Sequence, residues 1–99
     1  MTFGLSTLDF ETLQQKVIEP LKRAGFQLFI FGSRATGKHH PFSDIDILVE
    51  PPPQADMHLF SVVKEDIQEA RFPVKVDFVL VDQLAASYRA RVHGEKVRV

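Results

Sequence analysis

Helical periodicity of apolar residues is clearest near the start of the chain. The first predicted helix covers residues 9–24 and ends before Gly25, a typical C-terminal stop. Its apolar positions recur at helical spacing: Phe10, Leu13, Val17, Ile18 and Leu21. We expect Ser6 and Asp9 to form a capping box at its start. We also expect Pro20 to kink or briefly break this helix, because proline lacks the backbone N–H that a helix interior uses.

Two further helices are predicted in the second half of the chain. One covers residues 56–71, and its inward face is expected to carry Leu59, Val62, Val63, Ile67 and Ala70. The other begins with Asp82 as its N-cap and runs toward His93, where Gly94 stops it.

Three apolar segments have the character of β-strands: residues 27–31, 44–49 and 74–81. About a dozen residues join the first two, which permits antiparallel neighbours. A helix connects the second strand to the third, so these two must run parallel. If the three strands are neighbours, the end of the first lies beside the starts of the other two.

Composition narrows the class of protein. The chain has 99 residues, 44% of them hydrophobic and 25% charged, which predicts one globular domain over residues 1–99. Its net charge of −1 argues against strong binding to nucleic acid. It has no cysteine and no apolar run of membrane-spanning length, so we expect a cytoplasmic protein without a membrane segment.

Aspartates stand at the starts of two predicted strands. Asp44 and Asp46 open the second strand, and Asp77 lies near the start of the third. Side chains two positions apart on a strand share one face at about 6 to 7 Å. Two carboxylates that close repel by about 2 to 3 kcal/mol at an effective dielectric near 20. A raised pKa, a nearby cation or a bound metal could compensate, and oxygen-only ligands favour Mg²⁺ or Mn²⁺.

A small-residue turn follows the first strand, at the edge where the aspartates converge. The amide of Gly32 and the hydroxyl of Ser33, which open a short helix, provide groups that bind phosphate. Glycine lets the backbone approach such a ligand closely. Arg34 could neutralise phosphate charge, although an arginine after a turn is commonly solvated.

These residues carry a resemblance to a known family. Gly32-Ser33, ten intervening residues, Asp44-x-Asp46 and a later Asp77 resemble the pattern of the DNA polymerase β-type nucleotidyltransferases. The segment "GSRATGKHHPFSDIDILVE" is similar to the minimal nucleotidyltransferases, which are commonly paired with a helical HEPN-domain partner as antitoxin and toxin. The resemblance implies an α/β (α+β) palm-like fold, a small mixed sheet of about three strands flanked by helices.

The resemblance also implies the chemistry. It implies Mg²⁺-dependent transfer of AMP from ATP to a hydroxyl, with release of pyrophosphate. Gly32 and Ser33, with Arg34 as a further candidate, would bind the nucleotide. Asp44, Asp46 and Asp77 would be the catalytic and metal-binding residues, with Asp77 beside the attacking hydroxyl.

Other charged residues have more ordinary interpretations. Lys38, His39 and His40 form a basic loop that could approach a nucleotide, although such loops commonly face water. The basic residues near the C-terminus, Arg89, Arg91, Lys96 and Arg98, could reach phosphates, but cations near a helix end are also favourable for local reasons.

Three functions remain open at this point. The chain could transfer AMP to a partner protein, which the resemblance identifies as a HEPN toxin. It could instead modify a small molecule, as the aminoglycoside nucleotidyltransferases do, or act as a non-catalytic antitoxin or adaptor by binding alone. A homo- or hetero-oligomer is possible in each case. The first strand, apolar at all of residues 28–31, would add a docking surface unless both of its faces are covered internally.

Overall fold

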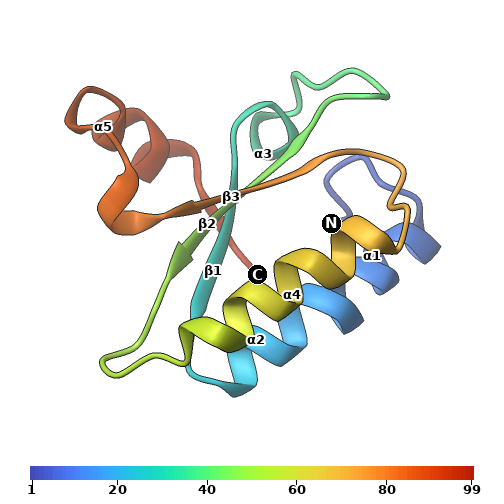
Figure 1. Ribbon diagram of the computed structural model, residues 1–99. Helices are drawn as coiled ribbons and strands as arrows, with labels where there is room; N and C mark the ends of the chain where they lie inside the picture. The colour runs from blue at the N-terminus through green and yellow to red at the C-terminus, as the bar shows by residue number, and fades with distance from the viewer.

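A four-stranded sheet with the order β3-β2-β1-β4 organises the chain, and the computed structural model describes all of residues 1–99 (Figure 1). The strands are β1 (Gln27–Phe31), β2 (Ile45–Glu50), β3 (Val76–Leu80) and β4 (Val97–Arg98). β1 is antiparallel to both β2 and β4, and β2 is parallel to β3. The predicted strand directions are therefore confirmed. The expected count of three strands was wrong by one, because β4 is only two residues long and has no local signal.

The predicted first helix is continuous but changes its pitch. It consists of α1 (Thr7–Leu13), a π-helical turn η1 (Gln14–Ile18) and α2 (Glu19–Arg23). The π turn lies directly before Pro20, so the helix accommodates the proline by widening rather than breaking. Half of the predicted capping box is present, because Ser6 Oγ accepts a hydrogen bond of 3.1 Å from the Asp9 amide.

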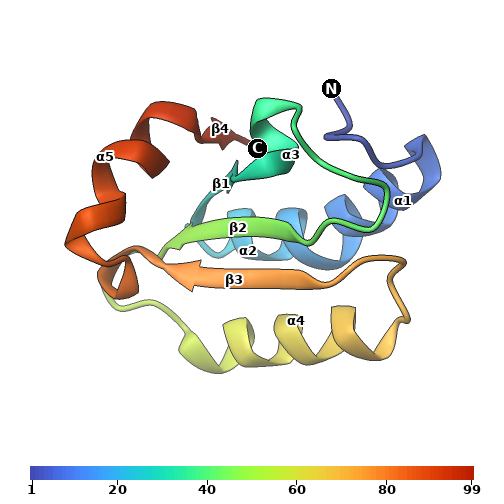
Figure 2. The ribbon, with the colours of Figure 1, turned by 90° about the horizontal axis from the view of Figure 1, so that it is seen from above.

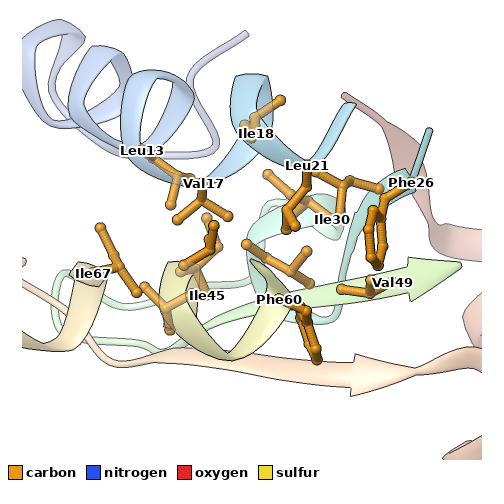
Figure 3. Close-up of a cluster of buried hydrophobic side chains, with 14 of the residues drawn as sticks. Leu13, Val17, Ile18, Leu21, Phe26, Ile30, Ile45, Val49, Phe60 and Ile67 are labelled. Atoms are coloured by element: carbon orange, nitrogen blue, oxygen red, sulfur yellow. The ribbon is translucent and has the colours of Figure 1, made fainter. Parts of the chain in front are cut away.

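The helix α4 (Met57–Glu69) packs with α1 and α2 on one face of the sheet (Figure 2). Asp56 caps α4, since its Oδ1 accepts a hydrogen bond of 3.0 Å from the Leu59 amide. The expected inward positions of Val62 and Ala70 were wrong: Val62 is 46% exposed, Ala70 is an exposed C-cap, and Phe60 is buried in the apolar stripe instead. The largest apolar cluster fills the space between these helices and the sheet (Figure 3), with Leu13, Val17, Leu21, Ile30, Ile45, Val49, Phe60 and Ile67 among its members.

The opposite face of the sheet is covered by the last helix. After β3 the chain forms a 3-10 turn, η2 (Val81–Gln83), and then α5 (Ala86–Glu95). Asp82 therefore lies inside the turn and does not cap α5, whose N-cap is Ala85, and α5 continues through Gly94. A smaller cluster joins α5 to the sheet: Phe29, Phe31, Leu48, Leu84 and Val92.

Both faces of β1 are consequently covered within the chain. Leu28 and Ile30 belong to the larger cluster, and Phe29 and Phe31 belong to the smaller one. The condition that would have made β1 a docking surface is not met. No helix in the structure combines the length and the hydrophobicity needed to cross a membrane.

Candidate active site

Two aspartates lie on one rung of the sheet, on the face that α5 covers. Asp46 of β2 is in register with Asp77 of β3 on one side and with Phe31 of β1 on the other. Their side chains share a face because side-chain direction alternates along each strand. Asp44 precedes β2 and is exposed. The predicted convergence of the first strand's end with the starts of the other two is therefore observed.

Gly32 forms the turn that ends β1 and brings the backbone against Asp46. Its φ of +77° is a conformation that favours glycine. A Cβ atom built on Gly32 would lie 2.5 Å from Asp46 Oδ2, so a larger residue would push into the carboxylate. Ser33 then opens the short helix α3 (Ser33–Thr36), as the sequence predicted.

The Asp46 carboxyl has a raised pKa, and the cause lies in its surroundings. The pKa is raised from 3.8 to about 6, with burial as the largest cause and the nearby charges of Asp77, Asp44 and Glu95 as the others. The Arg91 guanidinium acts in the opposite direction. Of the three compensations that a carboxylate cluster allows, the structure contains two: a raised pKa and nearby cations.

The second cation at this rung is a lysine. Lys75 Nζ lies 3.3 Å from Asp77 Oδ1, and the two side chains are 70% and 38% exposed to solvent. An exposed ion pair of this kind contributes little to stability, about 0 to 1 kcal/mol. The pair therefore leaves the Asp77 carboxylate accessible to a ligand.

The aspartates have the donor atoms that a divalent cation prefers, but they do not form a preformed metal site. No group of three or more His, Cys, Asp or Glu side chains is arranged to hold a metal ion. The expected three-aspartate site is thus not preformed. Asp46 and Asp77 nevertheless supply the oxygen donors that Mg²⁺ and Mn²⁺ prefer, and a cation between them would relieve the repulsion that raises the pKa of Asp46.

The Arg34 guanidinium contacts the loop before β2 and the N-terminal segment. Arg34 is only 3% exposed, and its guanidinium donates three hydrogen bonds to backbone carbonyls: Phe3 at 2.9 Å, Ser43 at 3.0 Å and Pro41 at 3.3 Å. These contacts hold the loop before β2 against the N-terminal segment. They describe a structural role, and the predicted contact of Arg34 with a nucleotide stays a prediction.

Two hollows meet at Gly32, Asp46 and Arg91. The first, of about 540 Å³, also has apolar walls from β3 and α5 and includes Asp77 and Tyr88. The second, of about 520 Å³, has no hydrophobic wall; its lining is Gly32, Ser33, Thr36, Lys38, Asp46, Arg91 and Glu95. The candidate site is therefore a carboxylate rung between a hollow of mixed lining and one lined by polar residues and glycine.

Two residues of α5 in this site were not singled out from the sequence. Glu95 Oε1 accepts a hydrogen bond of 2.9 Å from the Gly32 amide, across 63 positions of the chain. Arg91, which was grouped with the solvated basic end, lines both hollows. No local pattern could reveal these contacts, because they depend on how α5 folds back over β1. Lys38 also lines the polar hollow, so part of the basic loop does reach the site.

Comparisons with known proteins agree with this geometry. The sequence model of the nucleotidyltransferase domain family matches residues 11–99. A solved structure of a candidate minimal nucleotidyltransferase superposes with a TM-score of 0.72 at 25% identity, covering 96% of this chain and 97% of that one. A toxin–antitoxin crystal structure with AMP-PNP gives a TM-score of 0.63 at 23% identity, covering 86% of this chain and 70% of that one.

No curated protein matches the sequence significantly. The family match spans most of the chain, and the structural likeness to a minimal member extends over nearly all of it. The mixed sheet, the glycine turn after β1 and the aspartate rung are the features that this fold is expected to carry. The chain belongs to the nucleotidyltransferase domain family, as one of its minimal members.

Proposed function

We propose that this protein transfers AMP from ATP to a hydroxyl group on a partner protein and thereby acts as an antitoxin. Nucleotidyl transfer is the chemistry of its family. The observation that carries the proposal is the rung of Asp46 and Asp77 beside the Gly32 turn. That arrangement puts paired carboxylates within reach of a backbone turn suited to phosphate.

In this proposal the role of each residue follows from the chemistry of its backbone or side chain. Gly32 and Ser33 bind the triphosphate through a backbone amide and a hydroxyl. Asp44, Asp46 and Asp77 would hold Mg²⁺ or Mn²⁺, with water and phosphate oxygens completing the coordination. When bound, the cation would neutralise part of the negative charge on the phosphates.

The transfer step is a displacement at the α-phosphorus. The acceptor hydroxyl oxygen forms a bond to this phosphorus, and the bond to the bridging oxygen of the β-phosphate breaks. Pyrophosphate leaves with the bonding electron pair. The hydroxyl proton passes to the Asp77 carboxylate, which lies on the same rung as Asp46 and is accessible.

A protein acceptor is favoured by the open form of the site and by a structural relative. The hollows beside the aspartates are open, and residues from β3 and α5 form their apolar wall. A similar fold occurs in the toxin–antitoxin structure that contains AMP-PNP. The family resemblance further implies a HEPN toxin, whose tyrosine hydroxyl would receive AMP and whose ribonuclease activity would be lost.

The test is to co-express the product of the neighbouring gene with the wild-type chain or with the Asp44→Asn/Asp46→Asn double variant. Size-exclusion chromatography measures the complex, and mass spectrometry measures the partner. We expect both chains to form the complex and only the wild type to add one or more AMP masses to the partner. If the double variant protects cells equally and the partner is never modified, the protein acts by binding alone and the transferase proposal is wrong.

A further inference from the structure

The helix α5 is joined to the sheet through Val92 and through the residues that flank the helix. Its buried Val92 and the preceding Leu84 pack with Phe29 and Phe31 in the smaller cluster. β4, which follows α5, pairs with Phe29 and Ile30, and Figure 2 shows the chain running from α5 directly into this strand. Lys96 Nζ lies 4.2 Å from the centre of the Phe29 ring. Because both ends are attached to β1, α5 can present side chains to the site in a defined position.

Arg91 is the arginine that α5 presents there. It is exposed, it lines both hollows, and it makes no hydrogen bond or ion pair within the chain. Its guanidinium lies 5.3 Å from the centre of the Tyr88 ring, a contact that orients a cation without using its N–H donors. By contrast, Arg34 and Arg89 already donate to backbone carbonyls. Arg91 therefore has N–H donors without a partner in the chain, and it lines the hollows that are proposed to bind a polyanion.

Glu95 accepts a hydrogen bond from the Gly32 amide, which is the group proposed to bind phosphate. Its Oε1 accepts from the Gly32 amide at 2.9 Å, and that contact is partly buried. A carboxylate oxygen and a phosphate oxygen compete for the same kind of donor. Glu95 also lies close enough to Asp46 to raise its pKa, so two negative groups sit beside one amide.

The polar hollow has cations and hydroxyl groups that can bind a polyphosphate, beside the carboxylates of Asp46 and Glu95. Arg91 and Lys38 supply positive charge from α5 and from the loop after α3. Ser33 and Thr36 supply hydroxyl groups. The lining includes no hydrophobic residue.

We infer that α5 is part of the nucleotide site: Arg91 binds the polyphosphate of the incoming nucleotide, and Glu95 holds the Gly32 amide until that polyphosphate displaces it. This inference rests on the proposed function, because it assumes a nucleoside triphosphate as ligand. It assigns opposite effects on nucleotide affinity to these two residues. Arg91 raises nucleotide affinity, and Glu95 lowers it by competing for the amide and by repelling phosphate.

The experiment measures binding of an α,β-methylene ATP analogue and of AMP, each with Mg²⁺, by calorimetry. Arg91→Gln should raise the Kd for the ATP analogue about tenfold, because a hydrogen bond to a charged group is lost. It should change the Kd for AMP less than about threefold, since AMP lacks the polyphosphate tail. Arg98→Gln is the matched control, because it removes the same charge from exposed β4 and should leave both constants unchanged.

Glu95→Gln should change the affinity in the opposite direction. Removing its charge should lower the Kd for the ATP analogue about threefold or more. Far-UV circular dichroism and thermal unfolding check that each variant is folded, and Arg91→Lys provides a second variant that keeps the charge. Opposite effects from two residues of one helix cannot arise from general loss of that helix.

The outcomes separate this inference from the proposed function. If the wild type binds neither nucleotide, the proposed function itself is wrong. If the wild type binds the ATP analogue but Arg91→Gln behaves like Arg98→Gln, or weakens AMP equally, Arg91 is not a polyphosphate ligand. If Glu95→Gln weakens binding, Glu95 supports the ligand and does not compete with it.

Discussion

Burial and nearby negative charge together raise the pKa of the Asp46 carboxyl group. Its pKa of about 6 exceeds the ordinary 3.8, so between these values the folded chain binds a proton that the unfolded chain releases. The free energy of unfolding should therefore fall as the pH rises from about 4 to about 6. Asp46→Asn, which cannot ionise, should be more stable than the wild type above that window. We expect about 1 kcal/mol in metal-free buffer, a value reduced for solvent screening because the carboxyl is half-buried.

Urea unfolding of both proteins at about pH 4 and about pH 7.5 measures this difference. Asp82→Asn, on the exposed η2 turn, serves as the control and should show no comparable gain. A gain for Asp46→Asn of the same size at both pH values would contradict the electrostatic explanation. It would indicate that the substitution acts through packing.

Asp77 shares the rung and the proposed metal site with Asp46 but is assigned an additional role as proton acceptor. If its carboxylate accepts the acceptor's proton, Asp77→Asn should lower turnover by about a hundredfold or more. Nucleotide binding, which rests mainly on the glycine turn and on Asp46, should persist. Calorimetry with the ATP analogue and a separate transfer assay distinguish the two effects. Equal loss of binding and turnover would make Asp77 only another ligand, and an unchanged rate would remove it from the site.

Gly32 can be compared with Gly37, a second glycine of positive φ. Gly37 has φ +80° and ψ +8°, the left-handed helical region, where alanine costs about 1 to 2 kcal/mol, whereas Gly32 has φ +77° and ψ −156°, a region essentially restricted to glycine, where alanine is more strained. An added Cβ meets Asp46 Oδ2 only at Gly32, and at Gly37 it meets nothing within 4 Å. Gly32→Ala should therefore lose more stability than Gly37→Ala and should also lose nucleotide binding. Equal effects in thermal unfolding and binding would show that the approach to Asp46 is unimportant.

At the scale of elements, the strength of the local signal decided what the sequence could predict. Strands β1, β2 and β3 are apolar runs and were predicted with their directions, and the glycine turn followed from its position after β1. The π turn before Pro20 was predicted only as a kink, because proline signals disruption without specifying its form. β4 and the start of α5 were missed, since two residues carry no periodicity and Asp82 imitates an N-cap.

The loop before β2 depends on a buried arginine rather than on apolar packing. Arg34 donates to three carbonyls there, and lysine cannot reproduce that planar set of donors. Arg34→Lys should therefore lower the free energy of unfolding by about 1 to 3 kcal/mol, measured in urea. Nucleotide affinity at a temperature where the variant is folded should change little. A loss of affinity with unchanged stability would instead support the predicted contact of Arg34 with the nucleotide.

At the scale of the molecule, the site is assembled from distant parts of the chain. Gly32 comes from the end of β1, Asp46 and Asp77 from β2 and β3, and Arg91 and Glu95 from α5. The aspartates could be predicted because strand register and topology bring them together. The α5 residues could not, since the hydrogen bond that Glu95 accepts from Gly32 and the place of Arg91 in both hollows depend on packing on the second face of the sheet. The sequence therefore predicted the convergence that topology determines, and the catalytic role of these residues stays a prediction.

The central claim is that the Asp46–Asp77 rung transfers a nucleoside monophosphate. The most direct measurement incubates the wild-type chain, the partner and Mg²⁺ with ATP labelled in either the α- or the γ-phosphate. We predict that the partner acquires the α label and not the γ label, that chelation of Mg²⁺ prevents this, and that Asp46→Asn does not label the partner. Transfer of the γ label would identify phosphoryl transfer instead. Labelling that survives Asp46→Asn, or no labelling by a folded wild type bound to its partner, would contradict the claim.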